Sequence, residues 1–246
     1  IPVVCLYLLT LLLTPKYVND IPEGSMIAEY YKSEKNNDVL ILGDCEVYEN
    51  ISTVKMWEEY GITSYIRGSS EQLIWQSYYL LEDTLKHETP KVVVLSMLAM
   101  SEADAKSEAY NRMTLDGMRW SKSKWNSIKE SMTEKETMGS YIFPLLRYHS
   151  RWSELSSDDI KYMFNKPKVT SNGYLMQVGV RPVTTVPKVS PLANYTFSDR
   201  NYEYLDKIKD LCNEKGIKLV LIKAPSIFCL KMYNWQGRVT GKEYKE

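Results

Sequence analysis

Four short apolar runs bounded by polar or turn-forming residues set the pattern of this chain. They cover residues 38–42, 62–66, 91–97 and 217–223. Continuous apolar runs of this length are typical of strands that are buried on both faces of a parallel sheet. The stretches beside them have helical periodicity. We expect helices at about 51–60, closed by Gly61, at 71–87, capped by Ser69 or Ser70, and between Ser198 and Gly216.

Strands that alternate with helices at this spacing predict right-handed βαβ units. The expected fold class is therefore α/β, with a three-layer flavodoxin-like parallel sheet. Residues of about 99–197 interrupt the pattern as a large, mainly helical insertion, with helices beginning near Ser121 and Ser156. Insertions of this size usually cover a site or contact a partner. Only about 20 polar residues follow the last strand, so we expect the domain to be truncated or divergent at its C-terminal end.

The first 14 residues are almost wholly apolar and have no polar face. This run is shorter than the roughly 20 residues that span a bilayer. We expect residues 1–16 to be part of a membrane anchor or signal segment whose start is missing; the alternative is a buried helix. Residues 17–37 then form a linker to the α/β domain at 38–246. An anchor would place that domain outside the cytoplasm.

Composition narrows the possible partners and cofactors. The 31 basic and 31 acidic residues balance, and no basic block stands out, which argues against nucleic acid as a partner. The four cysteines form no CxxC pair, and with only two histidines there is no zinc-ligand spacing. We expect neither a metal nor a cofactor. Cys5 and Cys212 are expected to be small buried hydrophobic residues.

The candidate chemistry lies where the first strand ends. Gly43 closes that strand, and Asp44, Cys45 and Glu46 follow it. Open α/β sheets place their sites at the carboxyl ends of such strands. A thiol at a helix N-terminus is favoured as thiolate, but the two flanking carboxylates oppose that effect. Cys45 is thus a candidate nucleophile or, alternatively, a small side chain that packs after the strand.

Five segments together resemble a known superfamily. They are residues 38–48 (Asp-Val-Leu-Ile-Leu-Gly-Asp-Cys-Glu-Val-Tyr), 60–72, 90–95, 141–152 and 219–226. Their order and spacing are similar to those of the SGNH/GDSL hydrolases, and most similar to the membrane-anchored branch near the D-alanine transfer protein and the alginate O-acetylation proteins. The resemblance covers most of residues 38–226.

The resemblance implies acyl-ester chemistry by a serine nucleophile, a backbone oxyanion hole and an Asp-x-x-His. Carried over to this chain, the nucleophile position is Cys45, the oxyanion glycine is Gly68 and the oxyanion asparagine is Asn111. Cysteine therefore replaces serine, and the Asp-x-x-His has no counterpart before Glu246. His149 is the remaining candidate base. Gly68 has a second explanation, since a glycine also suits the turn from strand to helix.

Substrate binding is assigned to Asp44, Glu46, Arg147 and Arg151. The two arginines could bind an anionic or sugar ligand, or could instead fasten the insertion to the sheet. Two functions stay open. One is an extracytoplasmic, membrane-anchored esterase or O-acyltransferase of the bacterial cell surface, acting on acyl esters of cell-envelope polysaccharide with a membrane acyl-donor protein as partner. The other is a non-catalytic binding or accessory protein on the same fold.

Overall fold

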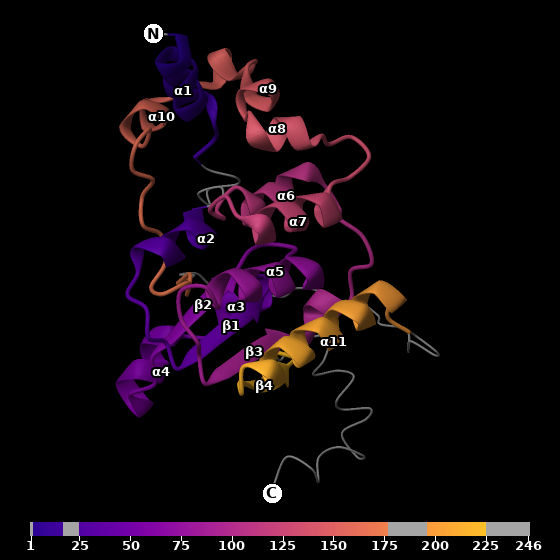
Figure 1. The fold of residues 1–246 in the computed structure, drawn as a ribbon. Coiled ribbons are helices and arrows are strands. Elements are labelled where there is room, and N and C mark those ends of the chain that lie inside the picture. Colours follow the sequence, from indigo (N-terminus) through magenta and orange to yellow (C-terminus); the bar gives the residue numbers. More distant parts are fainter. Residues whose placement is uncertain (1, 17–24, 177–195, 225–246) are drawn as a thin grey trace, which may run out of the picture.

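The computed structural model describes residues 2–16, 25–176 and 196–224. Its centre is an open sheet of four strands, all parallel, in the order β2-β1-β3-β4 (Figure 1). The strands are β1 (Val39–Gly43), β2 (Ser64–Gly68), β3 (Val92–Ser96) and β4 (Lys218–Ile222). Each lies within about two residues of the apolar run that predicted it. The expectation of an α/β fold with a parallel sheet flanked by helices is confirmed.

Helices connect the strands and cover both faces of the sheet. They are α3 (Cys45–Asn50), α4 (Thr53–Tyr60), α5 (Ile74–Thr84) and α11 (Asp199–Glu214). On one face, Leu40 and Leu42 pack in a core with residues of α5 and α11. On the other face, Val39 and Ile41 pack with Val47 of α3. Burial of each such side chain stabilises the fold by roughly 1.5–3 kcal/mol, which explains why β1 is apolar at every position.

The predicted closing glycines of α4 and α11 and the predicted serine cap of α11 agree with the structure, whereas the cap of α4, Ser52, was not predicted. Ser52 caps α4 and Gly61 ends it with a φ of 65°; Ser198 caps α11, and Gly216 follows it with a φ of 68°. The expected cap of α5 is wrong, because Leu73 precedes that helix. The backbone carbonyl of Ser69 instead accepts a hydrogen bond from the backbone N–H of Gln72, and this bond closes a turn before the helix begins.

The insertion is helical in its described part, residues 99–176 and 196–197. It contains α6 (Glu108–Leu115), α7 (Lys122–Ser131), α8 (Met138–Ile142), α9 (Leu145–Tyr148) and α10 (Ser157–Lys161), and the short 3-10 helices η2 (Met97–Met100) and η3 (Arg151–Glu154). Ser121 and Ser156 cap α7 and α10 as the sequence predicted. After α10 the chain returns to the sheet, where the N–H of Ile66 donates to the carbonyl of Asn172 at the edge of β2.

The N-terminal helix α1 (Pro2–Leu13) lies against α9 and α10, at the end of the molecule away from the sheet (Figure 1). Cys5 is exposed on it rather than buried. Among the residues that the structure describes, none forms a helix with the length and apolar character needed to cross a membrane.

Part of the segment expected to be a linker is packed. Residues 25–32 form α2 (Ser25–Glu29) and η1 (Tyr30–Lys32), and Ile27 and Tyr30 are fully buried. The Tyr30 ring lies 4.2 Å from the guanidinium carbon of Arg67, a buried residue of β2. Ile27 packs in the apolar core beside β1, whereas Tyr30 stacks on a charged strand residue, a contact that hydrophobic periodicity does not reveal.

Candidate functional site

The carboxyl ends of β1, β2 and β3 approach one another closely. Gly43 pairs with Gly68 in the sheet register. A Cβ atom added to Gly43, whose φ is 152°, would lie 2.7 Å from the Cβ of Ser96, and one added to Gly68 would lie 2.9 Å from the carbonyl oxygen of Gly43. Neither position has room for a Cβ atom, so both residues must be glycine for the strand ends to approach in this way. The position after β1 and the glycine of β2, which the resemblance pairs in one site, are brought to the same edge of the sheet.

Asp44 caps the helix that follows β1. Its side chain accepts a hydrogen bond of 2.9 Å from the backbone N–H of Glu46, as N-cap residues do. Asp44 is buried, and burial raises the pKa of its carboxyl to about 6. At pH 7 the carboxylate is still mostly ionised and lies next to Cys45.

Cys45 is the first residue of α3 and is half-buried. Burial raises the pKa of its thiol to about 11, and the negative charge of Asp44 adds to the effect. More distant carboxylates, those of Glu49 and Glu71, act in the same direction. The thiol is therefore protonated at neutral pH, and the helix N-terminus does not activate it.

Glu46 joins the ends of three strands. The hydroxyl of Ser96, at the end of β3, donates to one carboxylate oxygen at 2.5 Å, and the ammonium of Lys223, after β4, donates to the other at 2.5 Å. The carboxylate is buried and both its oxygens bind the protein. Ser96 and Lys223 are not among the predicted site residues. Each is a polar residue at the end of an apolar strand, and the rule that placed Asp44 to Glu46 could have found both.

The two remaining catalytic candidates lie elsewhere. Asn111 is buried in α6, where its amide donates to the carbonyl of Ser131 at 2.6 Å and to the carboxylate of Glu136 at 3.0 Å. Its donors serve contacts between helices and not a strand end. His149 follows α9 and is exposed, and its Nδ1 lies 3.1 Å from the carbonyl oxygen of Leu146. The sheet register thus brings Cys45 and Gly68 to one edge of the sheet, whereas the side-chain hydrogen bonds of Asn111 and His149 are made to other groups.

The arginines of the insertion contact other parts of the insertion and α1. Arg147 pairs with Glu108 at 2.7 Å. Arg151 donates to the carbonyl of Leu13 at 2.6 Å and lies 3.6 Å from Asp159. These contacts do not reach the sheet, to which the alternative would fasten the insertion: Arg147 joins two parts of the insertion, and Arg151 joins the insertion to α1.

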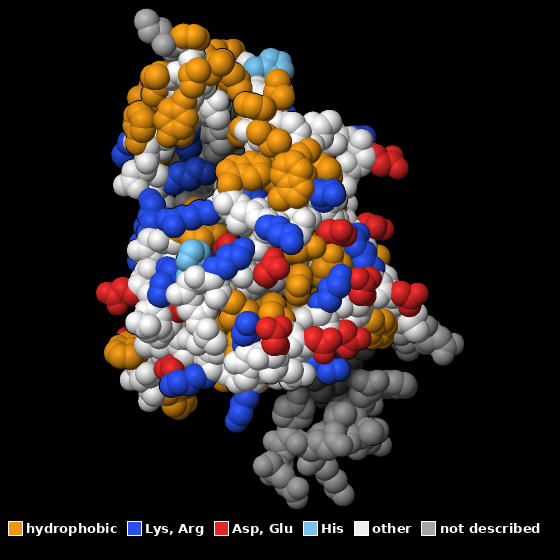
Figure 2. Space-filling model, in the orientation of Figure 1, with side chains coloured by type: hydrophobic (Ala, Val, Ile, Leu, Met, Phe, Trp, Pro, Cys, Tyr) orange, Lys and Arg blue, Asp and Glu red, His pale blue; other side chains and the backbone are white. Residues whose placement is uncertain are grey.

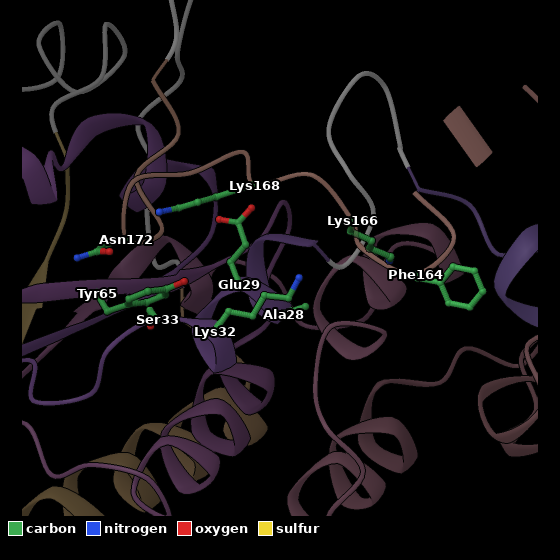
Figure 3. A pocket seen from close by; sticks show the side chains of 9 residues that line it. All are labelled: Ala28, Glu29, Lys32, Ser33, Tyr65, Phe164, Lys166, Lys168 and Asn172. Atoms are coloured by element: carbon green, nitrogen blue, oxygen red, sulfur yellow. The ribbon is translucent and has the colours of Figure 1, made fainter. Parts of the chain in front are cut away.

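A separate cavity of about 250 Å³ lies near the N-terminal end of β2 and not at the carboxyl ends of the strands (Figure 3). Its lining combines an apolar part with charged side chains: Ala28, Glu29, Lys32, Ser33, Tyr65, Phe164, Lys166, Lys168 and Asn172. Glu29 accepts hydrogen bonds from the backbone N–H groups of Val169 and Thr170. None of the predicted site residues lines this cavity. Within the described ranges, no group of three or more His, Cys, Asp or Glu residues is placed to hold a metal ion.

The chain was compared with protein-family models, with curated proteins and with solved structures. No match was found in any of the three.

Proposed function

We propose that the chain is an SGNH/GDSL-type domain that acts as an esterase or O-acyltransferase on acyl esters of cell-envelope polysaccharide. The observation that carries the proposal is the approach of the first three strand ends, where Gly43 pairs with Gly68 and packs against Ser96. In the superfamily that the sequence resembles, the nucleophile and an oxyanion amide follow the first two strands. Cys45 and Gly68 occupy these positions here.

The strand order supports a flavodoxin-like sheet as part of this proposal. The order β2-β1-β3-β4 equals the first four positions of the flavodoxin-like order 2-1-3-4-5. In such sheets the chain turns in opposite directions from the first and third strands, and ligands bind in the crevice at that switch point. Cys45 follows β1 and Ser96 ends β3, so both flank the proposed crevice.

The proposed reaction begins when the Cys45 sulfur attacks the acyl carbonyl carbon. The thiol first gives its proton to water, the carbonyl oxygen becomes an oxyanion held by backbone N–H groups near Cys45 and Gly68, and the alkoxide departs and takes a proton from water. The resulting thioester is hydrolysed by water or transferred to another hydroxyl, which restores the thiol. Because the pKa of Cys45 is about 11, attack at neutral pH uses a small thiolate fraction.

The proposal includes a location and two further partners. The apolar and largely exposed first half of α1 suits contact with a membrane, and we place the domain outside the cytoplasm at a bacterial cell surface. A membrane protein that supplies acyl groups is the corresponding donor for the transferase reaction.

The test compares the native chain with Cys45→Ala and Cys45→Ser on a chromogenic acetyl ester, with intact-mass detection of an acetylated protein. The expected result is slow hydrolysis and an acetyl adduct on Cys45 that both vanish in Cys45→Ala. Cys212→Ala is the matched control, because Cys212 is a buried cysteine of α11 away from the strand ends. Hydrolysis that survives in Cys45→Ala, or no hydrolysis and no adduct in the native chain, would overturn the catalytic proposal.

A non-catalytic binding protein is the second candidate. It is favoured by the protonated Cys45 thiol and by the position of His149, which lies beyond α9 and not beside α3. This candidate predicts that acetylated oligosaccharides bind without turnover. Calorimetric titration of the native chain and of Gly68→Ala separates the two, since a binder at the strand ends loses affinity in the variant while ester hydrolysis is absent in both.

A further inference from the structure

One end of the molecule carries a concentration of exposed apolar side chains. They come from α1 and from the insertion, two parts of the chain far apart in sequence, and Figure 2 shows them gathered above the rest of the molecule. We call this surface the apolar cap and define it by Val3, Val4, Leu6, Tyr7, Ile142, Phe143, Leu146, Trp152 and Ile160, which are between 41% and 77% exposed. Surfaces of this kind mark sites of contact with a partner or a membrane.

Polar contacts hold the two parts of the cap together. The last carbonyl groups of α1 have no partners within the helix and accept hydrogen bonds from two cations. The ammonium of Lys16 donates to the carbonyl oxygens of Leu11 at 2.6 Å and of Leu12 at 3.3 Å. The guanidinium of Arg151 donates to the carbonyl oxygen of Leu13 at 2.6 Å. Two cations at a helix C-terminus also suit its dipole. Asp159 of α10 lies 3.9 Å from Lys16 and 3.6 Å from Arg151. These contacts fix α1 against the insertion, so the two parts of the apolar cap form one continuous surface.

The shape of α1 favours a lipid surface over a protein as the occupant. The helix has no charged residue and no polar face, and its first half, including Val3, Val4 and Leu6, is exposed on several sides. A protein docked along one side would leave the other sides in water, whereas acyl chains surround a helix.

Charge and aromatic residues point the same way. Residues 138–161, the part of the insertion that carries the cap, hold three Lys or Arg and three Asp or Glu, and Lys16 adds one more cation. Figure 2 shows basic side chains directly beneath the apolar cap on the face in view. Trp152 and Tyr7, both more than half exposed, are side-chain types that favour the boundary between headgroups and acyl chains. An apolar tip above a basic band matches a membrane that contains anionic lipids.

We propose that the insertion, through Phe143, Leu146 and Trp152, enters the headgroup–acyl boundary of an anionic membrane beside α1. The domain then contacts the bilayer at two places and is held in one orientation, instead of rotating freely about α1. This inference does not depend on ester chemistry, because it concerns α1 and the insertion, at the end of the molecule away from the sheet.

The experiment uses the full chain and vesicles of phosphatidylcholine with phosphatidylglycerol whose acyl chains are brominated. Bromine quenches tryptophan fluorescence only at close range, so Trp152 is expected to supply most of the quenching. Trp152→Phe should remove it, whereas Trp57→Phe should not, because Trp57 is equally exposed but lies on α4 away from the cap. Equal quenching in the two variants would overturn the proposal.

A partition assay isolates the insertion from α1. Replacing Phe143 and Leu146 by serine should weaken vesicle binding by about tenfold, since two exposed apolar side chains no longer enter the lipid. The matched control replaces Trp57 and Tyr60 on α4. Unchanged vesicle binding of the Phe143/Leu146 variant, or equal binding of the native chain to purely zwitterionic vesicles, would refute the inference. It would also be refuted if the native chain formed a stable oligomer that the same variant dissociates, and if lipid did not quench Trp152. Hydrolysis of a soluble ester should be unchanged, so failure here is distinct from failure of the proposed function.

Discussion

The ionisation of Cys45 is the property that best separates the two proposed functions, and its alkylation rate measures it. With a pKa of about 11, roughly one thiol in a thousand is ionised at pH 8. For an ordinary cysteine with a pKa near 8.5, the fraction is about one in four. Since only the thiolate reacts, Cys45 should be alkylated roughly 200-fold more slowly than a cysteine in a short peptide.

Limited access would also slow the reaction, so the pH profile is the decisive measurement. Access lowers the rate by the same factor at every pH, while a raised pKa changes the shape of the profile. Iodoacetamide labelling of Cys45, followed by peptide-resolved mass spectrometry, should give a rate that rises tenfold per pH unit through pH 10. Asp44→Asn keeps the cap acceptor and removes one charge, and it should raise the rate at pH 8 by about three- to tenfold.

A plateau below about pH 8 would refute this reasoning. It would mean that the α3 N-terminus, or a base from outside the described residues, ionises Cys45 despite its burial and its acidic neighbours. Such a result would strengthen the catalytic proposal. A rate that shows the expected slope but does not respond to Asp44→Asn would instead leave burial alone as the cause of the raised pKa.

Three further predictions concern the sheet and its edge. The pKa of Asp44 in the folded state is raised to about 6, so the protonated carboxyl stabilises the fold fully below pH 4, and this stabilisation is lost as the pH rises through 6. Urea unfolding should therefore show Asp44→Asn to be more stable than the native chain by up to about 3 kcal/mol at pH 8 and equal to it at about pH 3.5. Asp83→Ala removes the carboxylate 3.1 Å from the buried guanidinium of Arg67 and should cost about 3–5 kcal/mol in the same assay; a loss below 1 kcal/mol would contradict a buried pair. Gly43→Ala should cost about 1–3 kcal/mol through its clash with Ser96, and a neutral effect would show that the strand ends separate easily.

The sequence predicted those parts of the fold whose signal is local. Each strand was marked by an apolar run, α4 by its closing glycine, and α11 by a serine cap and a closing glycine. The packing of residues 25–32 was not predictable in this way, since Tyr30 stacks on the guanidinium of Arg67 and donates to Glu88 at 2.8 Å. Contacts between charged and aromatic residues about 35–60 positions apart leave no periodicity in the chain.

The candidate site shows the same division. The strand-end rule selected Cys45, and the family resemblance added Gly68; the sheet register, in which Gly43 pairs with Gly68, brings both positions to one edge. The strand-end rule did not reveal how the neighbouring carboxylates are used. Glu46 was assigned to substrate binding, but its oxygens meet Ser96 and Lys223, and the latter lies 177 residues away in the chain. Lys223 reaches Glu46 because β4 lies beside β3. The order of the strands depends on the whole sheet and cannot be seen in a local stretch of sequence.

The balance of forces at residue 45 follows from their magnitudes. A helix N-terminus favours a negative charge by about 0.3–1 kcal/mol at an exposed site, and α3 is only six residues long. A rise of two pKa units corresponds to roughly 3 kcal/mol before screening by solvent. Burial and the charge of Asp44 therefore outweigh the helix dipole. Ionising Cys45 at neutral pH would require a cationic or basic partner that contributes several kcal/mol, and Lys223, which follows β4, already pairs with Glu46. Releasing Lys223 by Glu46→Gln should then lower the pKa of Cys45, whereas Lys223→Met should raise it, and the alkylation profile detects both changes.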